Sequence, residues 1–129
     1  MTDINWRSWV WDRLSTAGAL PTLIPSQFGG GSVPNNPKKP FMVIQISSKE
    51  PEFRDGDAPL NHRQILNVWV YDEPGSYKRI DTALGLVRDA LVGRDDRICV
   101  WTGDSGDLAD DTYGAITRYA TFQLTGGSA

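Results

Sequence analysis

The alternation of apolar and polar residues predicts four strands in this chain. Residues 41–48 (FMVIQISS) carry apolar side chains in both phases, and the segment 50–59 (EPEFRDGDAP) interrupts the pattern. The next strand, residues 61–72, is apolar on both faces, and two further strands are expected at residues 98–102 and 113–124. A strand that is apolar on both faces needs cover on both, so we expect helices or another chain on each side of the sheet.

Helical spacing of apolar residues predicts two amphipathic helices. Asp3 is suited to cap the first helix, residues 4–17, and Ser76 is suited to cap the second, residues 76–92. Their apolar stripes consist of Trp6, Trp9, Val10, Leu14 and Ala17 in the first helix and of Tyr77, Ile80, Leu84, Val87 and Leu91 in the second. Gly85 lies within the second helix, and we expect it to be tolerated there at a cost of about 1 kcal/mol relative to alanine.

These elements predict an α+β fold: a mostly antiparallel four-stranded sheet with two main helices packed on it, because turns rather than alternating helices separate the strands. The length of 129 residues favours one domain, residues 1–129. Residues 20–24 are expected to form a short extended or turn segment. The segment 25–40 is expected to be a long Gly/Pro-rich loop, and residues 126–129 a flexible tail.

Both helices carry more apolar surface than one packing partner covers. Ile4 and Trp11 lie off the stripe of the first helix, and Leu86 lies off the stripe of the second. One interpretation is a first helix wedged between the sheet and the long loop, and the other is contact with a second subunit, since extra apolar surface on a monomer usually has a partner. Ile4, Trp11 and Leu86 are therefore the candidate residues for a subunit interface.

The charge balance narrows the choice of partners. A net charge of −3 and a pI near 5.0 argue against a general nucleic-acid coat or an anionic-membrane binder. No segment resembles a signal peptide or a membrane span, and the single cysteine fits a reducing compartment, so we expect a soluble protein. Lys38 and Lys39 form a basic pair in the predicted loop, either solvated or facing nucleic acid or a partner. Arg118 falls in the apolar phase of the last strand, so we expect its charge to reach the sheet end or a carboxylate.

Few residues are candidates for a catalytic or metal-binding site. His62 is the single histidine and has no neighbouring nucleophile in sequence, and Cys99 lies in an apolar strand, so neither predicts catalysis. Four aspartates follow that strand: Asp104, Asp107, Asp110 and Asp111. Their spacing does not match a calcium-binding loop, and a solvated acidic turn is favoured over a cation site. We therefore predict no catalytic, metal or cofactor site and no enzymatic activity.

The order of four segments resembles a known family. PFMVIQIS, NVWVYDEPGS, RIDTALGLVRDAL and YGAITRYATFQL follow one another with a loop, a break and an acidic loop between them. This arrangement, over about residues 4–125, resembles the tail terminator proteins, also called tail completion or tail-to-head joining proteins, of bacteriophages with long non-contractile tails.

The resemblance implies a structural role without a cofactor. Such proteins form a ring, commonly of six copies, at the head-proximal end of the tail tube, where they stop tube polymerisation and provide the surface that joins the head. The implied partners are further copies of the chain, the tail tube protein, a head-completion or connector protein, and genomic DNA that passes through the lumen without sequence-specific binding. The implied location is the virion tail, after assembly in the host cytoplasm, and Lys38 and Lys39 are candidates to lie near the DNA.

Three other functions stay open. The first is another head-tail connector or neck protein of the same particle. The second is a monomeric ligand-binding α+β domain, with residues 25–40 as a lid and Trp69 or Trp101 lining a pocket. The third is an enzyme that uses the four aspartates with a metal ion.

Overall fold

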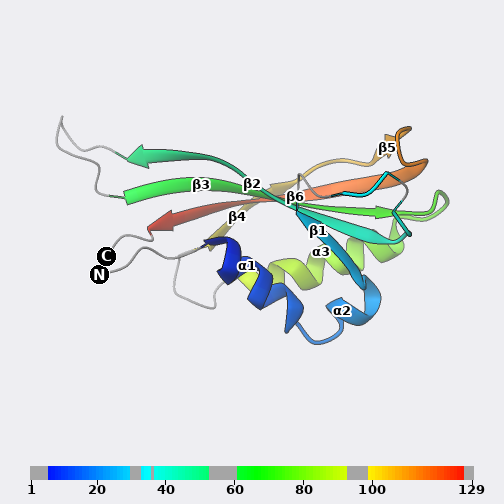
Figure 1. Cartoon of the computed structure of the whole chain (residues 1–129), viewed down its shortest axis with the longest axis horizontal. Coiled ribbons are helices and arrows are strands. Elements are labelled where there is room, and N and C mark those ends of the chain that lie inside the picture. Colours follow the sequence, from blue (N-terminus) through cyan, green and yellow to red (C-terminus); the bar gives the residue numbers. More distant parts are fainter. Residues whose placement is uncertain (1–5, 30–32, 36, 53–60, 93–98, 127–129) are drawn as a thin grey trace.

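A six-stranded sheet with helices on one of its faces forms the described part of the chain (Figure 1). The computed structural model describes residues 6–29, 33–35, 37–52, 61–92 and 99–126. In chain order the elements are α1 (Trp6–Ser15), α2 (Leu20–Leu23), β1 (Ser26–Gly29), β2 (Phe41–Glu52), β3 (Asn61–Asp72), α3 (Lys78–Leu91), β4 (Cys99–Asp104), β5 (Leu108–Asp110) and β6 (Ala115–Gly126). The α+β class is confirmed, whereas the sheet has six strands and not the predicted four.

The sheet is mostly antiparallel, as predicted. Its strand order is β1-β2-β3-β6-β4, and β5 also pairs with β6. β1 runs parallel to β2, whereas the pairs β2–β3, β3–β6, β4–β6 and β5–β6 are antiparallel. The central strand β3 therefore has β2 on one side and β6 on the other, and β1 and β4 lie at opposite edges.

The two additional strands are short and lie in segments predicted to be loops. β1 is SQFG, four residues inside the predicted loop 25–40, and β5 is LAD, three residues inside the acidic segment. So few residues cannot display an alternating pattern, and the pairing of Phe28 with Val43 depends on a contact distant in sequence. The prediction of an unstructured segment was wrong for β1.

The other element boundaries differ modestly from the prediction. β2 continues to Glu52, beyond the predicted break at residue 50, with a register shift between Ile46 and Lys49. Residues 20–23 form the one-turn helix α2 rather than an extended segment, and Pro21 in its first turn has a backbone angle suited to a helix start. Asp3 and Ile4 lie outside the described residues, so the predicted start of the first helix is not tested.

The core lies between the helices and one face of the sheet. On α3 the buried side chains are Ile80, Ala83, Leu84, Val87, Ala90 and Leu91, which confirms the predicted stripe of this helix. They pack in one cluster with Leu66, Val68 and Val70 of β3, with Ala120, Phe122 and Leu124 of β6, and with Val10 and Leu14 of α1. Figure 1 shows α1 and α3 on the same side of the sheet. The helical face of the sheet is thus closed by the chain itself.

The N-terminus of α3 differs in detail from the predicted cap. Tyr77 occupies the N-cap position and makes no side-chain capping bond. The Ser76 hydroxyl oxygen instead accepts a hydrogen bond from the Lys78 backbone N–H at 3.2 Å. Ser76 therefore satisfies a free amide of the first turn from one position earlier than an N-cap residue.

Replacement of Gly85 by alanine is expected to stabilise the fold. A Cβ atom at Gly85 meets no heavy atom within 4 Å in the described structure, so the change removes the backbone flexibility of glycine without a clash. We expect the free energy of unfolding to rise by about 1 kcal/mol, and the melting temperature to rise by about 4 °C.

Thermal unfolding of Gly85→Ala beside Gly114→Ala checks this expectation. Gly114 also has open space around its missing Cβ, but its φ of 58° lies in the left-handed region, so its alanine variant should be destabilised. A melting temperature of Gly85→Ala at or below that of the original chain would contradict the assignment of Gly85 as a merely tolerated residue.

Candidate interaction surfaces

The interface candidates from the sequence occupy the margin of the core. Trp11 on α1 and Leu86 on α3 are half-buried and pack against the core cluster, and Ile4 lies outside the described residues. Lys38 is exposed and Lys39 is half-buried in the connection between β1 and β2. Intramolecular packing therefore covers part of the surplus apolar surface that the sequence indicated on the helices.

The exposed large apolar side chains of the described structure lie elsewhere, on one edge of the sheet. Val100, Trp101 and Leu108 have exposed fractions of 44%, 38% and 38%. All three sit on β4 or β5, which pair with the same strand β6 on the side away from β3. We call these two strands the β4/β5 edge. No pattern of residues predicts this edge, because the position of a strand at a sheet edge depends on the tertiary pairing.

Trp101 is held in place from two directions. Its indole Nε1–H donates a hydrogen bond to the Asp104 carboxylate at 2.9 Å. The Arg88 guanidinium of α3 lies over the ring, 4.6 Å from its centroid, which is a cation–π distance. An exposed aromatic ring fixed in this way loses little conformational entropy when a partner covers it.

Arg118 fixes the connection between β4 and β5. Its Nε and Nη2 donate to the Ser105 carbonyl at 3.2 and 3.1 Å, and Nη1 donates to the Asp81 carboxylate of α3. The Asp107 carboxylate lies 3.5 Å from Nε. The backbone of Tyr119 adds a bond in each direction, accepting from the Ser105 N–H at 2.8 Å and donating to its hydroxyl at 3.0 Å. The expectation that Arg118 pairs with a carboxylate is confirmed.

Three of the four loop aspartates have a partner in the chain. Asp104 binds Trp101, Asp107 approaches Arg118, and Asp110 accepts a hydrogen bond from the Tyr113 N–H at 3.2 Å. The fourth, Asp111, is exposed. In the part of the chain that the structure describes, no three His, Cys, Asp or Glu side chains gather as metal ligands. The aspartates instead give the β4/β5 edge its acidic character.

The face of the sheet opposite the helices is closed mainly by aromatic rings. The Phe41 and Tyr71 rings stack with their centroids 4.6 Å apart. The Tyr113 ring contacts both rings edge-on, with centroid distances of 5.3 Å to Phe41 and 5.5 Å to Tyr71. Trp69 and Tyr119 pack at 4.2 Å beside them. Burial, with smaller contributions from Asp110 and Tyr113, raises the pKa of Tyr71 to about 12, so its hydroxyl stays neutral. The cover by helices or another chain that was expected on both faces of β3 is thus present on one face only, and the other face carries these aromatic side chains, most of which belong to the strands themselves.

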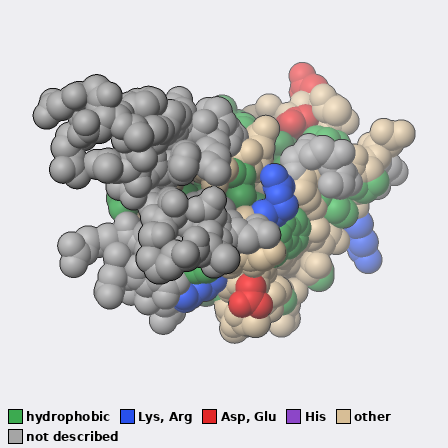
Figure 2. Space-filling model, turned by 60° about the vertical axis from the view of Figure 1, so that its left-hand side comes forward, with side chains coloured by type: hydrophobic (Ala, Val, Ile, Leu, Met, Phe, Trp, Pro, Cys, Tyr) green, Lys and Arg blue, Asp and Glu red, His purple; other side chains and the backbone are tan. Residues whose placement is uncertain are grey.

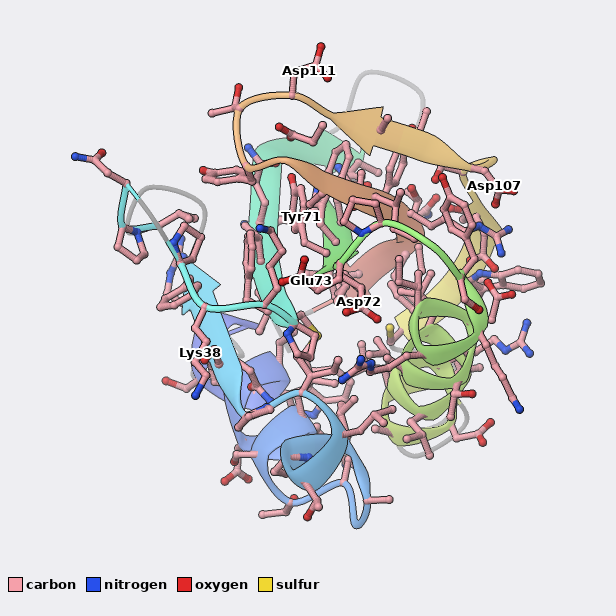
Figure 3. The ribbon with its side chains drawn as sticks, turned by 90° about the vertical axis from the view of Figure 1, so that its right-hand side faces the viewer. Lys38, Tyr71, Asp72, Glu73, Asp107 and Asp111 are labelled. Atoms are coloured by element: carbon pink, nitrogen blue, oxygen red, sulfur yellow. The ribbon has the colours of Figure 1, made fainter. Side chains whose placement is uncertain are left out.

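A cavity of about 550 Å³ opens where β3 ends and α3 begins. It is lined by Leu23, Asp72, Glu73, Pro74, Ser76, Lys78, Arg79 and Thr82. The buried Asp72 carboxylate in its wall binds Arg79 Nε at 2.9 Å and the Glu73 N–H at 2.7 Å, and Figure 3 shows it between the sheet and the helices. Neither Trp69 nor Trp101 lines this cavity, so it does not match the pocket expected for a ligand-binding domain.

Among the residues that the structure describes, basic side chains do not form a continuous surface on the face shown in Figure 2. Lysine and arginine side chains stand there as separate groups among apolar and uncharged residues. The described part of this face therefore carries no single basic stripe of the kind expected for a nucleic-acid coat, in agreement with the net charge of −3. The described helices also include none that is long and apolar enough to cross a bilayer.

Replacement of Arg118 by leucine should loosen the β4–β5 connection while it preserves the apolar stem of the side chain. We expect about 1 kcal/mol of local stability to be lost with the charged hydrogen bonds to Ser105. The half-exposed Asp81 should add little to this value. Hydrogen exchange of the Ser105 and Tyr119 amides should then become about fivefold faster. The control is Arg7→Leu on the exposed side of α1, and equal exchange in the two variants would contradict the role of Arg118.

Cys99 should resist alkylation in the folded protein. Its side chain is 3% exposed and burial raises the pKa of its thiol to about 12, so little thiolate is present at pH 8. We expect iodoacetamide to react at least about a hundredfold faster after unfolding in urea, measured by mass spectrometry. Fast labelling of the native chain would contradict the buried core position that the sequence predicted for Cys99. The side chain of His62 lies outside the described residues.

Comparison with known proteins finds similar folds among solved structures. No family model and no curated protein sequence matches this chain. Among solved structures, a chain from the virion of a native gene transfer agent particle superposes with a TM-score of 0.69 at 14% identity, covering 92% of each chain. The gp17 protein of bacteriophage SPP1 superposes with a TM-score of 0.55 at 14% identity, covering 95% of this chain and 91% of gp17. The resemblance inferred from the order of elements is therefore confirmed at the level of the fold: the chain shares its fold with a chain of a gene transfer agent virion and with gp17 of bacteriophage SPP1.

Proposed function

We propose that this chain is a structural subunit of a phage tail, which forms a ring at the head-proximal end of the tail tube, stops tube polymerisation and provides the surface for joining to the head. The observation that carries the proposal is the superposition on a gene transfer agent virion chain over 92% of both chains. A match of this extent means that the whole domain, and not one motif, has the architecture of a virion component.

The surface of the molecule supports an assembly role over a binding pocket. The described large apolar side chains that reach solvent gather on a sheet edge, and a fixed Trp101 lies among them. Fully buried centres of protein interfaces are enriched in such aromatic residues. Trp11 and Leu86 keep part of their surface exposed, so they remain proposed margins of the subunit contact, together with Ile4.

The partners of such a ring follow from its place in the particle. We propose contacts with other copies of the chain, in a ring of six, with the tail tube protein on one side and with a head-completion or connector protein on the other. DNA would pass through the lumen without sequence-specific binding, and the chain would act without enzymatic activity. The location is the head-proximal end of the virion tail, reached after assembly in the host cytoplasm.

Lys38 and Lys39 have two possible uses in a ring. They face either the DNA in the lumen, as the resemblance implies, or an acidic surface of the neighbouring subunit. Within the described part of the chain neither lysine forms an ion pair. Their charge is therefore available to a partner in both arrangements.

Deletion of the gene from its phage should produce overlong tails that do not join heads. A tube without its terminating ring keeps a free end to which further tube protein adds. Electron microscopy of lysates measures tail length and head attachment, and expression of the chain from a plasmid should restore both. Negative-stain images of the purified protein, alone and with tail tubes, should show a ring.

The possible outcomes separate the candidate functions. Tails of normal length that fail to join heads would assign the chain to another neck or connector position, which the virion neighbour supports equally well at the level of fold. Tails of normal length that do join heads would refute a role in either position.

A further inference from the structure

The two edges of the sheet differ in chemistry. The β4/β5 edge carries the exposed apolar side chains Val100, Trp101 and Leu108 together with exposed aspartates. At the opposite edge, β1 is four residues long and half-buried along its length. Lys38 and Lys39 lie beside this strand, because the chain that carries them enters β2 where Phe41 pairs with Ser26, the first residue of β1. We call β1 with these two lysines the β1 edge.

The strand register brings the lysines and two of the aspartates to the same end of the sheet. One row of paired residues crosses the whole sheet through Ser26, Phe41, Tyr71, Thr117 and Leu108. Lys38 and Lys39 precede this row on the β2 side, and Asp110 and Asp111 follow it on the β5 side. Because β2 and β5 run in opposite directions, both pairs lie on the same side of this row, toward one end of the strands, although they are at opposite edges of the sheet. Figure 3 shows Lys38 beside β1, and Asp111 on the far side of the sheet from it.

We propose that the β4/β5 edge of one copy docks against the β1 edge of the next copy, with Asp110 and Asp111 facing Lys39 and Lys38 of that neighbour. This inference rests on the proposed ring function. A ring needs two different patches on each subunit, which meet head-to-tail around the axis. The sheet offers two such patches on opposite edges, with opposite charges at matching positions.

The alternative pairing between copies is electrostatically unfavourable. A twofold dimer would bring each edge against its own copy, so that the acidic β4/β5 edge would meet a second acidic edge, or the two lysines of the β1 edge would meet a second basic edge. Like charges placed opposite each other suppress an association, whereas opposite charges favour it and set its register. The charge pattern thus selects the head-to-tail arrangement over the twofold one.

The apolar side chains supply the buried centre of the proposed contact. Val100 pairs in register with Gln123 and Trp101 with Phe122, so they point to opposite faces of the sheet at its edge. A neighbour that covers this edge removes apolar surface from water on both faces. Burial of such surface contributes about 25 cal/mol for each Å². The charges therefore determine orientation, and the apolar groups contribute affinity.

A charge exchange between two exposed residues tests the docking. Lys38→Glu and Asp111→Lys each place like charges across every interface of a ring, and neither residue has an ion pair within the described structure. We expect each variant alone to raise the concentration for half-maximal ring assembly about fivefold or more at low salt. An equimolar mixture, or the two changes in one chain, should return it to within about twofold of the original value, because each unlike pair is restored.

Native mass spectrometry and sedimentation velocity provide the readout, with tail tubes present if the ring needs them as a template. In the mixture, mass-labelled variants should occur in equal numbers within each ring, since only alternating copies place opposite charges together. Arg7→Glu is the matched control, with the same charge change at an exposed position of helix α1 instead of a sheet edge. Melting temperatures verify that all variants fold. Leu108→Asn should weaken assembly without recovery in the charge-exchange mixture.

Each outcome separates this docking from the ring itself. Rings of Lys38→Glu that assemble like the original would overturn the proposed docking, and a simultaneous loss of DNA retention would assign the lysines to the lumen. The proposed docking would also be overturned if Lys38→Glu and Asp111→Lys each weaken ring assembly and their equimolar mixture does not restore it. If the original chain forms no ring even on tail tubes, the proposed function fails, whatever the variants do.

Discussion

The packing of α3 across β3 and β6 is the constraint on which the rest of the structure depends. One helix of 14 residues buries six side chains against the two strands that lie adjacent at the middle of the sheet. Burial of one large aliphatic side chain contributes about 1.5–3 kcal/mol, so the four such side chains among them make this contact a large favourable contribution to folding. Because α1 and α2 pack on the same face of the sheet as α3, all the described helices lie on one face.

The opposite face must then be closed by the strands themselves. Stacked and edge-on rings from β2, β3 and the turn before β6 bury Phe41 and Tyr71 without a helix. Aromatic rings suit this task, since a single residue covers a large area and its ring contacts add about 0.5–1.5 kcal/mol beyond burial. The edges offer a further capacity for contacts, because strands there end the hydrogen-bonded ladder.

The sequence predicted the parts of this fold that repeat a pattern over many residues. β3 was expected at residues 61–72 and occupies that span, and the buried stripe of α3 was expected from its spacing. Arg118 was also recognisable, because a charge in an apolar phase requires a partner, and the structure supplies Asp81 and Ser105. In each case the local spacing of residues contains the structural information.

The spacing of residues does not predict the edge strands of the sheet. β1 and β5 have four and three residues, too few for periodicity, and each exists because a distant strand offers a partner. The exposure of Val100 and Leu108 likewise follows from which strand lies last in the sheet. Trp11 and Leu86 illustrate the converse, since apolar residues off a helical stripe still found cover at the margin of the core. The residues that are exposed at a surface depend on which elements pack beside them, and those contacts cannot be derived from the local pattern of a single sequence.

The low identity to the structural neighbours is consistent with this division between core and edge. At 14% identity, this chain shares its fold with each neighbour, while most individual residues differ. Cores tolerate such exchange as long as volume and patterning are kept. An interface between copies of one chain has a further freedom, because a change on one edge can be compensated by a change on the other edge of the same sequence. The two edges of the sheet are therefore expected to vary together, as a complementary pair, on a fold that stays the same.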